Sequence, residues 1–191
     1  MKKVLLKTLL YVFILIFIYF LIISFAIYPC ITQGMSMYPT IGPNEIILTN
    51  RWKAITNKES IKRGDIVTIE EPSLFYVSSE EYDENNVVAH YSNKINFNPF
   101  RTRWLKRVIG IAGDHIQITK DEELYINGIK QDEDYVDGNY TNITEYGMEY
   151  MYIDLIVPEN TVYVMGDNRI ESADSRSFGC VPLNKVYSVL F

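Results

Sequence analysis

Residues 104–119, W-L-K-R-V-I-G-I-A-G-D-H-I-Q-I-T, decide the fold class of this chain. The stretch holds two apolar, β-rich runs separated by a turn that contains glycine. Successive side chains of an extended strand point to opposite faces, so Trp104, Lys106 and Val108 share one face. The stretch therefore predicts two strands joined by a turn, with Lys106 pointing toward an apolar interior.

Similar β-rich runs recur on both sides of this stretch, at residues 45–49, 65–69 and 161–165. Leu124-Tyr125-Ile126 followed by Asn127-Gly128 predicts a hairpin, because Asn-Gly tolerates the positive φ of a type I′ turn. Helical periodicity is scarce, so we expect a mostly β domain. Residues 73–100 and 132–146 are polar and irregular, which predicts surface excursions.

The N-terminal region predicts a membrane anchor. Residues 8–27 carry no charge, and about 20 residues at ~1.5 Å rise span a ~30 Å hydrocarbon core. A cleavable signal would be shorter and would end in a small-x-small site, which Ala26-Ile27-Tyr28 lacks. We therefore assign residues 8–28 to a retained transmembrane helix.

The distribution of charge predicts the orientation of this helix. Lys2, Lys3 and Lys7 precede it, whereas the first basic residue after it is Arg51. By the positive-inside rule, we expect residues 1–7 to be cytoplasmic and residues 29–191 to form an extracytoplasmic domain.

Composition excludes several classes of function. The net charge is -6, and without the three N-terminal lysines 15 basic residues face 24 acidic ones, which does not suit nucleic acid. Cys30 and Cys180 form no C-x-x-C pair and no cluster with histidine, so we expect no metal site. The two thiols are most simply small buried side chains, with a single disulfide as the alternative.

Two segments offer catalytic side chains. In G-M-S-M-Y-P-T, residues 34–40, Ser36 lies in a Gly/Pro loop that can present a hydroxyl and backbone N–H groups together, although such a loop is by itself typical of a turn. Burial of Lys106 would lower its pKa from ~10.4 toward ~7–8, whereas an edge-strand lysine that reaches water is the alternative. A Ser-His-Asp triad with His90 or His115 stays open as a weaker reading.

A third segment, residues 165–179, reads M-G-D-N-R-I-E-S-A-D-S-R-S-F-G. Its Asp, Arg and Ser residues follow a β-rich run directly. This density of pairing groups predicts a loop in which carboxylates and guanidinium groups fix the backbone, with a solvated turn as the alternative.

Together and in this order, the segments resemble the bacterial type I signal peptidases, membrane proteases with a Ser-Lys dyad. The resemblance covers the apolar anchor, residues 34–40, R-G-D-I-V at 63–67, residues 104–114 and residues 165–182. It implies two antiparallel β-sheets with the active site in an apolar groove near the membrane. A related branch of the family has histidine where this chain has Lys106, so the lysine indicates the bacterial type.

Position by position, the resemblance makes Ser36 the nucleophile and Lys106 the general base. Gly34 stands where some members carry a serine that supports the oxyanion, which leaves that task to the Ser36 N–H. Ser172 matches a serine that orients the lysine. Further supporting positions are Asp174, Arg176, Asp167, Arg169 and Arg107. The pockets for small side chains before the cut are expected near Met35, Met37 and Ile66.

The expected function is a membrane-bound serine endopeptidase that cleaves signal peptides from translocated preproteins without metal or cofactor. The alternative is a catalytically idle, membrane-anchored accessory module of the same fold, which would be expected to have lost Ser36 or Lys106. A self-cleaving repressor-type Ser-Lys protease is a third reading, which the apolar anchor and the acidic domain argue against.

Overall fold

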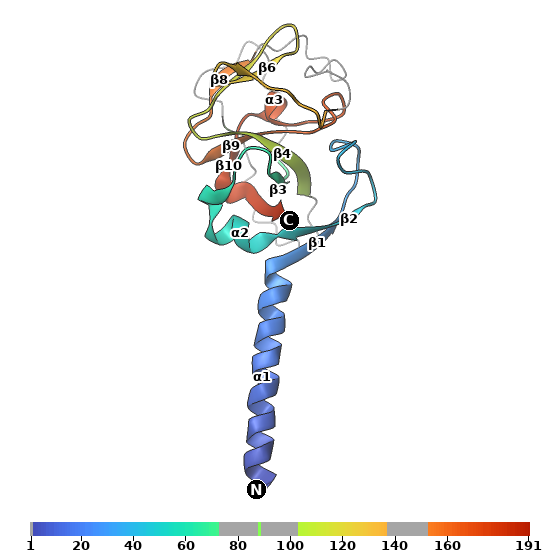
Figure 1. Ribbon diagram of the computed structural model, residues 1–191, viewed down its shortest axis with the longest axis vertical. Coiled ribbons are helices and arrows are strands. Elements are labelled where there is room, and N and C mark those ends of the chain that lie inside the picture. The colour runs from blue at the N-terminus through green and yellow to red at the C-terminus, as the bar shows by residue number, and fades with distance from the viewer. Residues whose placement is uncertain (1, 73–87, 89–102, 137–152) are drawn as a thin grey trace.

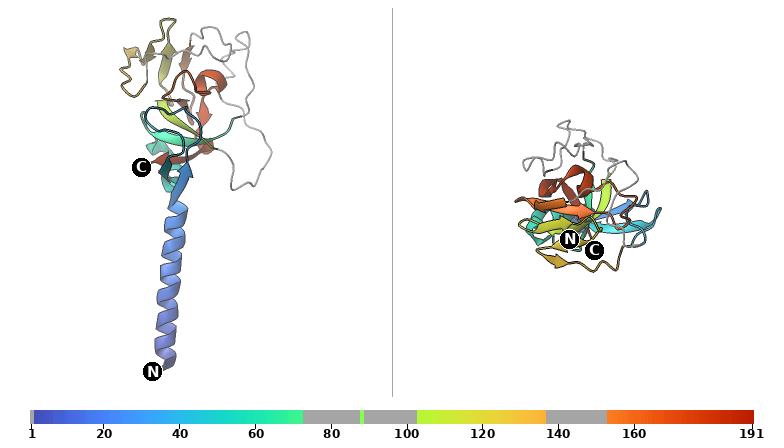
Figure 2. Two further views of the ribbon diagram at one scale, coloured as in Figure 1. Left: turned by 90° about the vertical axis from the view of Figure 1, so that its right-hand side faces the viewer. Right: turned by 90° about the horizontal axis from the view of Figure 1, so that it is seen from above.

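The computed structural model describes residues 2–72, 88, 103–136 and 153–191, which form a β domain at the end of one long helix (Figure 1). Helix α1 (Lys2–Ala26) projects away from the domain, as Figure 1 and the left view of Figure 2 show. Within the described residues it is the one helix long and apolar enough to cross a membrane, and none of its Lys3–Phe20 window is buried.

The helix bounds differ from the sequence prediction at both ends. The helix begins at Lys2 because the flanking lysines are good helix formers and continue it. It ends at Ala26, whereas the predicted span reaches residue 28. Strand β1 (Ile27–Ile31) follows at once, since Pro29 lacks an N–H and disfavours a helical conformation at Tyr28.

A seven-stranded antiparallel sheet positions the candidate site. Its strand order is β1-β2-β11-β3-β4-β9-β10. Pro29 lies on an edge strand of this sheet, where a missing backbone donor is tolerated. The strands after β1 are β2 (Ile46–Asn50), β3 (Ile66–Glu70), β4 (Arg103–Ile111), β9 (Thr161–Met165), β10 (Val181–Pro182) and β11 (Val186–Leu190).

A second, four-stranded antiparallel sheet packs against β4 and β9. Its order is β7-β6-β5-β8, with β5 (His115–Ile118), β6 (Leu124–Ile126), β7 (Ile129–Lys130) and β8 (Ile153–Ile156). Asn127 and Gly128 join β6 to β7 with φ of 54° and 77°, as the predicted type I′ turn requires. The prediction of a mostly β fold with two antiparallel sheets is confirmed.

Two apolar clusters hold these layers together. One joins the small sheet to β4 and β9, and in it a Cβ on Gly110 would lie 2.7 Å from Ile116 Cδ1, so this close approach requires glycine. The other packs α2 (Arg51–Thr56) and α3 (Ser175–Phe178) on the large sheet through Ala54 and Phe178. Two 3-10 turns, η1 (Lys58–Ser60) and η3 (Leu183–Lys185), complete the described elements.

The predicted surface excursion at residues 73–100 lies outside the described residues, apart from Val88, which bridges Cys180. Of the second predicted excursion, residues 132–136 are described. They contact the large sheet near the candidate site.

Candidate active site

Ser36 lies on the loop of residues 32–45, which connects β1 to β2 and is called the Ser36 loop below. Thr32 closes its base, since its Oγ1 donates to the Gly42 carbonyl at 2.7 Å and accepts from the Glu45 N–H at 2.9 Å. Gly34 adopts φ +83°, a conformation that favours glycine, although a Cβ at this position would meet no other atom within 4 Å. Buried side chains anchor the loop from below: Met37, Ile41, Ile47 and Ile66.

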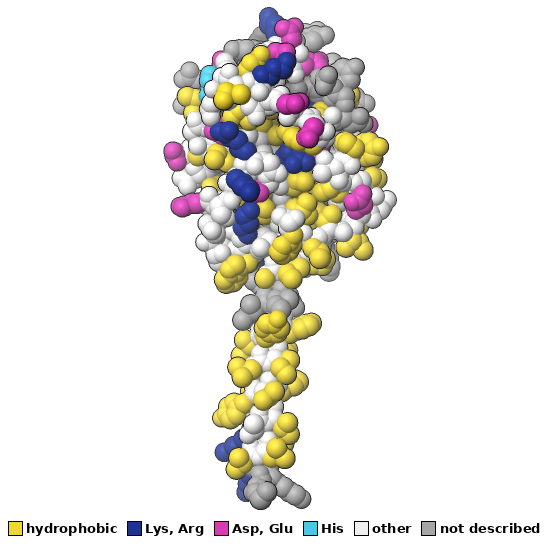
Figure 3. Space-filling view, in the orientation of Figure 1, with side chains coloured by type: hydrophobic (Ala, Val, Ile, Leu, Met, Phe, Trp, Pro, Cys, Tyr) yellow, Lys and Arg dark blue, Asp and Glu magenta, His cyan; other side chains and the backbone are white. Residues whose placement is uncertain are grey.

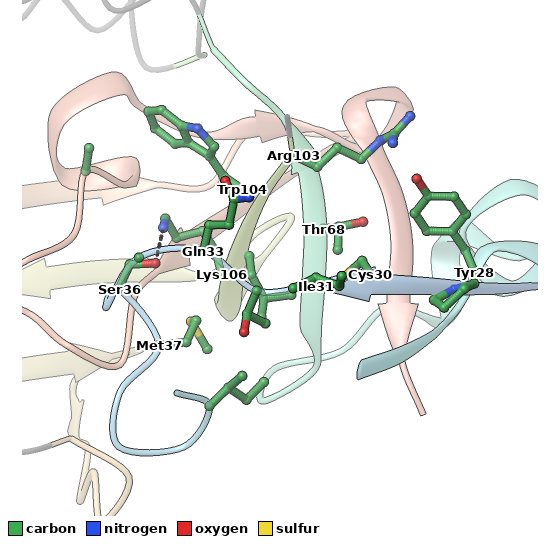
Figure 4. A pocket seen from close by; sticks show the side chains of 16 residues that line it. Tyr28, Cys30, Ile31, Gln33, Ser36, Met37, Thr68, Arg103, Trp104 and Lys106 are labelled. Atoms are coloured by element: carbon green, nitrogen blue, oxygen red, sulfur yellow. Dashed lines mark hydrogen bonds between the residues drawn. The ribbon is translucent and has the colours of Figure 1, made fainter. Parts of the chain in front are cut away.

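Lys106 lies on β4 opposite Val67 of β3, and only 3% of it is exposed. Its Nζ donates a hydrogen bond to Ser36 Oγ at 3.0 Å across 70 residues of sequence (Figure 4). Burial lowers the Lys106 pKa to about 8, with a further lowering by Arg176 and opposing contributions from the carboxylates of Asp174 and Asp167.

This pair can exchange a proton. A lysine with a pKa near 8 is partly neutral at physiological pH, and a neutral amine beside a hydroxyl can accept its proton. The alternation of side chains on β4 predicted the burial of Lys106, and the structure confirms it.

A pocket of about 590 Å³ opens beside the pair. Its walls come from β1, the Ser36 loop, Thr68 of β3 and the first four residues of β4 (Figure 4). Of the three side chains predicted to shape the pockets, Met37 lines this one. Met35 is 37% exposed and does not line this pocket. Ile66 lies beneath the Ser36 loop in the buried cluster.

The loop after β9 touches the serine directly. The Asn168 N–H donates to the Ser36 carbonyl oxygen at 3.1 Å, and the Gly166 N–H donates to Asp174 Oδ2 at 2.9 Å. A Cβ on Gly166 would collide with the Ser36 carbonyl oxygen and with the side chain of Ser172. Gly166 is therefore the position at which this loop can approach the nucleophile's backbone.

Ser172 lies beside Gly166 and is 1% exposed. Its Oγ makes no hydrogen bond within the part of the chain that the structure describes. The structure thus places Ser172 next to the Ser36 loop but shows no bond from it to Lys106.

Asp174 and Arg176 form a buried pair at the start of α3. Arg176 Nε and Nη2 each donate to Asp174 at 2.8 Å, and Nη2 also donates to the Arg169 carbonyl at 2.8 Å. Burial raises the pKa of Asp174, but Arg176 and the Gly166 N–H outweigh it and hold that pKa below its usual value. The predicted ion-paired loop is confirmed, and its negative charge lies close enough to raise the pKa of Lys106.

Arg107 and Asp167 form a second pair on the opposite face of β4 from Lys106. Arg107 donates to Asp167 twice, at 2.7 and 2.6 Å, in the two-pronged geometry that fixes both groups. Thr40 of the Ser36 loop also donates to Asp167, at 2.5 Å. This pair therefore ties β4, the loop after β9 and the Ser36 loop together.

Three residues of this network were not predicted from the sequence: Thr40, Glu133 and Tyr135. Glu133 accepts from Arg169 Nη1 at 2.8 Å, and the Tyr135 ring lies 4.1 Å from the Arg107 guanidinium carbon. Residues 132–136 thus run along the surface, as predicted for 132–146, but the side chains of Glu133 and Tyr135 turn back onto the domain. The sequence signal for this contact was an aromatic ring, Tyr135, two residues after the carboxylate of Glu133 within a polar run.

The histidine that the structure describes, His115, is not part of the site that holds Ser36 and Lys106. His115 contacts Asp154 on the small sheet, is substantially exposed and does not line the pocket. His90 lies outside the described residues. Cys30 and Cys180 are both free thiols, and burial raises the pKa of Cys180 to about 12.

Comparison with known proteins identifies the family of this chain. The family model described as signal peptidase, peptidase S26, matches residues 5–190. A signal peptidase I of Bacillus licheniformis is 35% identical over 159 residues, covering 82% of this chain and 70% of the relative. Signal peptidase IB of Staphylococcus aureus is 28% identical over 201 residues, covering 97% and 87%. A solved signal peptidase I of Enterococcus faecalis V583 is 29% identical and covers 69% of this chain and 97% of its own, with a TM-score of 0.44.

The family match includes the Ser36 loop, β4 and the loop after β9, which carry Ser36, Lys106 and the residues that contact them. The resemblance noted from the sequence is thereby confirmed. This chain belongs to the signal peptidase family, peptidase S26, and is a serine peptidase of the bacterial type I group.

Proposed function

We propose that this chain is a membrane-anchored endopeptidase that removes signal peptides from translocated preproteins, with Ser36 as nucleophile and Lys106 as general base. The observation that carries the proposal is the 3.0 Å contact between the buried Lys106 Nζ and Ser36 Oγ. The relatives' name, signal peptidase I, supplies the substrate class.

In the first half of the reaction, Ser36 Oγ bonds to the scissile carbonyl carbon while its proton moves to the neutral amine of Lys106. The ammonium then gives this proton to the nitrogen of the leaving peptide as the C–N bond breaks. The mature protein leaves with a free amino terminus, and the signal peptide stays as an ester of Ser36.

In the second half, a water molecule occupies the place of the leaving amine. Lys106 takes a proton from this water as its oxygen attacks the ester carbon, and returns the proton to Ser36 Oγ when the ester bond breaks. The backbone N–H of Ser36 is the expected donor to the oxyanion.

The surrounding residues hold this geometry. Gly166 and Asn168 set the backbone beside Ser36, while the buried Asp174 and Arg176 fix the loop that carries them. Arg107, Asp167 and Arg169 lock β4 and the Ser36 loop from the other side, and Ser172 packs between. We assign these residues to positioning because the described contacts join them to one another and to backbone groups.

The anchor brings the site to its substrate. Apolar side chains cover the described part of α1, and others lie at the end of the domain that faces the helix (Figure 3). Ile27, Ile31 and Trp52 are among the exposed apolar residues that follow the helix in the sequence. Ser36 follows Ile27 by nine residues, which span at most ~30 Å. With the N-terminal lysines in the cytoplasm, the domain lies outside, at the height where a translocated preprotein emerges from its own apolar helix.

The test is Ser36→Ala and Lys106→Met in the full-length chain. Each is expected to abolish cleavage of a preprotein inserted in vesicles, because each removes one partner of the proton transfer. Thermal unfolding checks that both variants stay folded, and Lys130→Met, on the exposed surface of the small sheet, is the matched lysine control. Cleavage at a near-normal rate by Lys106→Met would exclude the dyad.

An idle accessory module is separated from an enzyme by chemistry at Ser36. A serine-reactive probe suited to Ser-Lys sites is expected to label the wild-type chain and to spare Ser36→Ala. Absence of labelling together with absence of cleavage would favour the accessory role.

A further inference from the structure

A short segment behind the candidate site connects the small sheet to the residues that hold Ser36. Residues 132–136, called the clamp segment below, follow β7 of the small sheet. The Gln131 N–H donates to the Leu124 carbonyl of β6 at 2.8 Å, just before the segment begins. At its other end the Val136 N–H donates to the Glu133 carbonyl at 3.1 Å, which closes a turn. The small sheet therefore fixes where the clamp segment starts, and a backbone turn fixes how it folds back.

Glu133 supplies the counter-charge of Arg169. Arg169 is 1% exposed and the Glu133 side chain 10%, so the two charges meet away from water. Both terminal nitrogens of Arg169 donate to the Glu133 carboxylate, Nη1 at 2.8 Å. Burial lowers the pKa of Arg169, but the hydrogen bonds and the charge of Glu133 outweigh it and raise that pKa above its ordinary value. Removal of the Glu133 charge would leave a buried cation without this partner, which is costly.

Arg169 passes this constraint on to the nucleophile. Its Nε donates to the Gly166 carbonyl at 3.0 Å, within the loop after β9. In the same loop, the Asn168 N–H donates to the Ser36 carbonyl at 3.1 Å. A guanidinium that Glu133 holds at one end therefore fixes, at its other end, the turn that holds the Ser36 backbone.

Tyr135 supports the Glu133 carboxylate from the same segment. Its hydroxyl donates to Glu133 Oε1 at 2.7 Å. The centre of its ring lies 4.1 Å from the guanidinium carbon of Arg107 and 6.0 Å from that of Arg169. Arg107 in turn pairs with Asp167 in the loop after β9. The clamp segment therefore contacts both of the arginines that hold this loop.

We infer that Glu133 is a positioning residue for Ser36 that acts through Arg169, with Tyr135 holding the Glu133 carboxylate in place. The inference rests on the proposed function and extends its active site to the segment that leaves the small sheet. Glu133 does not line the pocket, so its loss should lower kcat and leave KM nearly unchanged. An ion pair that only stabilised the fold would have no such effect on enzyme that is folded.

The first experiment compares Glu133→Gln with Glu123→Gln in the full-length chain in neutral detergent, at a temperature at which both variants are folded. Glutamine keeps the shape of the side chain and removes its charge. Glu133→Gln should lower kcat on a signal-peptide substrate by about 10- to 100-fold, with KM within about twofold of the wild type. Glu123 makes the same two kinds of contact, with Tyr125 and Lys130, on the surface of the small sheet. Its variant should therefore leave kcat as in the wild type.

The second experiment separates position from stability. Arg169→Gln removes the hydrogen bond to the Gly166 carbonyl and should lower kcat at least as far as Glu133→Gln does. The double variant buries neither charge, so its Tm should exceed that of both single variants by several degrees. Its kcat should nevertheless stay at that of Arg169→Gln, because Glu133 acts through Arg169. A double variant that regained the wild-type kcat together with its Tm would show that Glu133 only stabilises the fold.

Three other results overturn the inference. A kcat of Glu133→Gln within about twofold of the wild type rejects the positioning role, while cleavage by the wild type upholds the proposed function. A pH profile of Glu133→Gln with a shifted midpoint would show that Glu133 acts through its charge on Lys106 and not through position. Absence of cleavage by the wild type, with Ser36 unlabelled by the probe, rejects the proposed function and the positioning role with it.

Tyr135→Phe provides the test if Glu133→Gln does not fold. This variant keeps the ring and removes only the hydrogen bond to the Glu133 carboxylate. It should lower kcat by about threefold or more without a change in KM. An unchanged kcat would reject the inference.

Discussion

At the scale of single residues, the proposed mechanism depends on the protonation of Lys106. Only the neutral amine can accept a proton, and with a pKa of about 8 its neutral fraction falls tenfold for each pH unit below that value. We therefore expect kcat/KM to rise tenfold per pH unit up to about pH 8 and then to level off. Initial rates between pH 5 and 10 measure this, and a limb near 10 would contradict a buried base.

The same shift predicts that Lys106 destabilises the fold. The pKa is about 8 when folded and 10.5 for the ordinary group, so between these values the unfolded chain binds more protons and the free energy of unfolding rises with pH. Below pH 8 the full penalty is present. Lys106→Met is expected to raise the free energy of unfolding at pH 7 by roughly 1–3 kcal/mol.

Urea unfolding in detergent at pH 7 and pH 10 tests this prediction. The gain from Lys106→Met should be smaller at pH 10, where the wild-type amine is largely neutral. A gain that is equal at both pH values would show that packing, and not charge, separates the two chains.

The two residues of the proposed dyad could be named from the sequence because local patterns made them candidates and the resemblance to a family gave them their roles. Alternation on β4 places Lys106 inward, and the Gly/Pro loop exposes Ser36. Glu133 and Tyr135 gave a weaker signal, an aromatic ring beside a carboxylate in a polar run, and nothing local indicated their partners Arg169 and Arg107. A polar run in a sequence is interpreted as exposed to solvent unless the residues that it contacts in the folded chain are known.

At the scale of elements, the contact between the Ser36 loop and the loop after β9 requires glycine at position 166. Gly166→Ala introduces a Cβ against the Ser36 carbonyl oxygen, so one loop must move. A displacement of this kind should lower kcat by at least about hundredfold. Steady-state kinetics on a signal-peptide substrate measure the effect.

Gly128→Ala is the control for Gly166→Ala. Gly128 has φ +77° in the β6–β7 turn with open space around it, so alanine there should cost about 1 kcal/mol of stability and leave kcat unchanged. Equal effects of the two substitutions on kcat would show that activity follows global stability, and not loop position.

The elements themselves were largely predictable, and their errors have local causes. Four β-rich runs became β2, β3, β5 and β9 to within a residue or so. The end of α1 was missed because hydrophobicity continues past Ala26 into β1, while Pro29 changes the backbone there. The pairing of β1 with β2 and of β11 with β3 depends on long-range contacts that composition does not encode.

At the scale of the whole molecule, the proposed role of α1 is to hold the domain at the membrane, and its apolar window adds nothing to the buried core. None of its apolar window is buried, so deletion of residues 2–26 should leave the β domain folded. We expect kcat/KM for a soluble peptide to change by only a few fold, and the rate on a vesicle-inserted preprotein to fall by about hundredfold or more. Equal losses on both substrates would give α1 a direct part in the active site.

The direct passage from α1 into β1 has a mechanical consequence. No flexible residues separate the helix from a strand that forms one wall of the pocket, since one ends at Ala26 and the other begins at Ile27. Acyl-chain length sets how far such a helix leans. A change in the tilt of α1 would therefore pass directly into β1, without an intervening loop to absorb it.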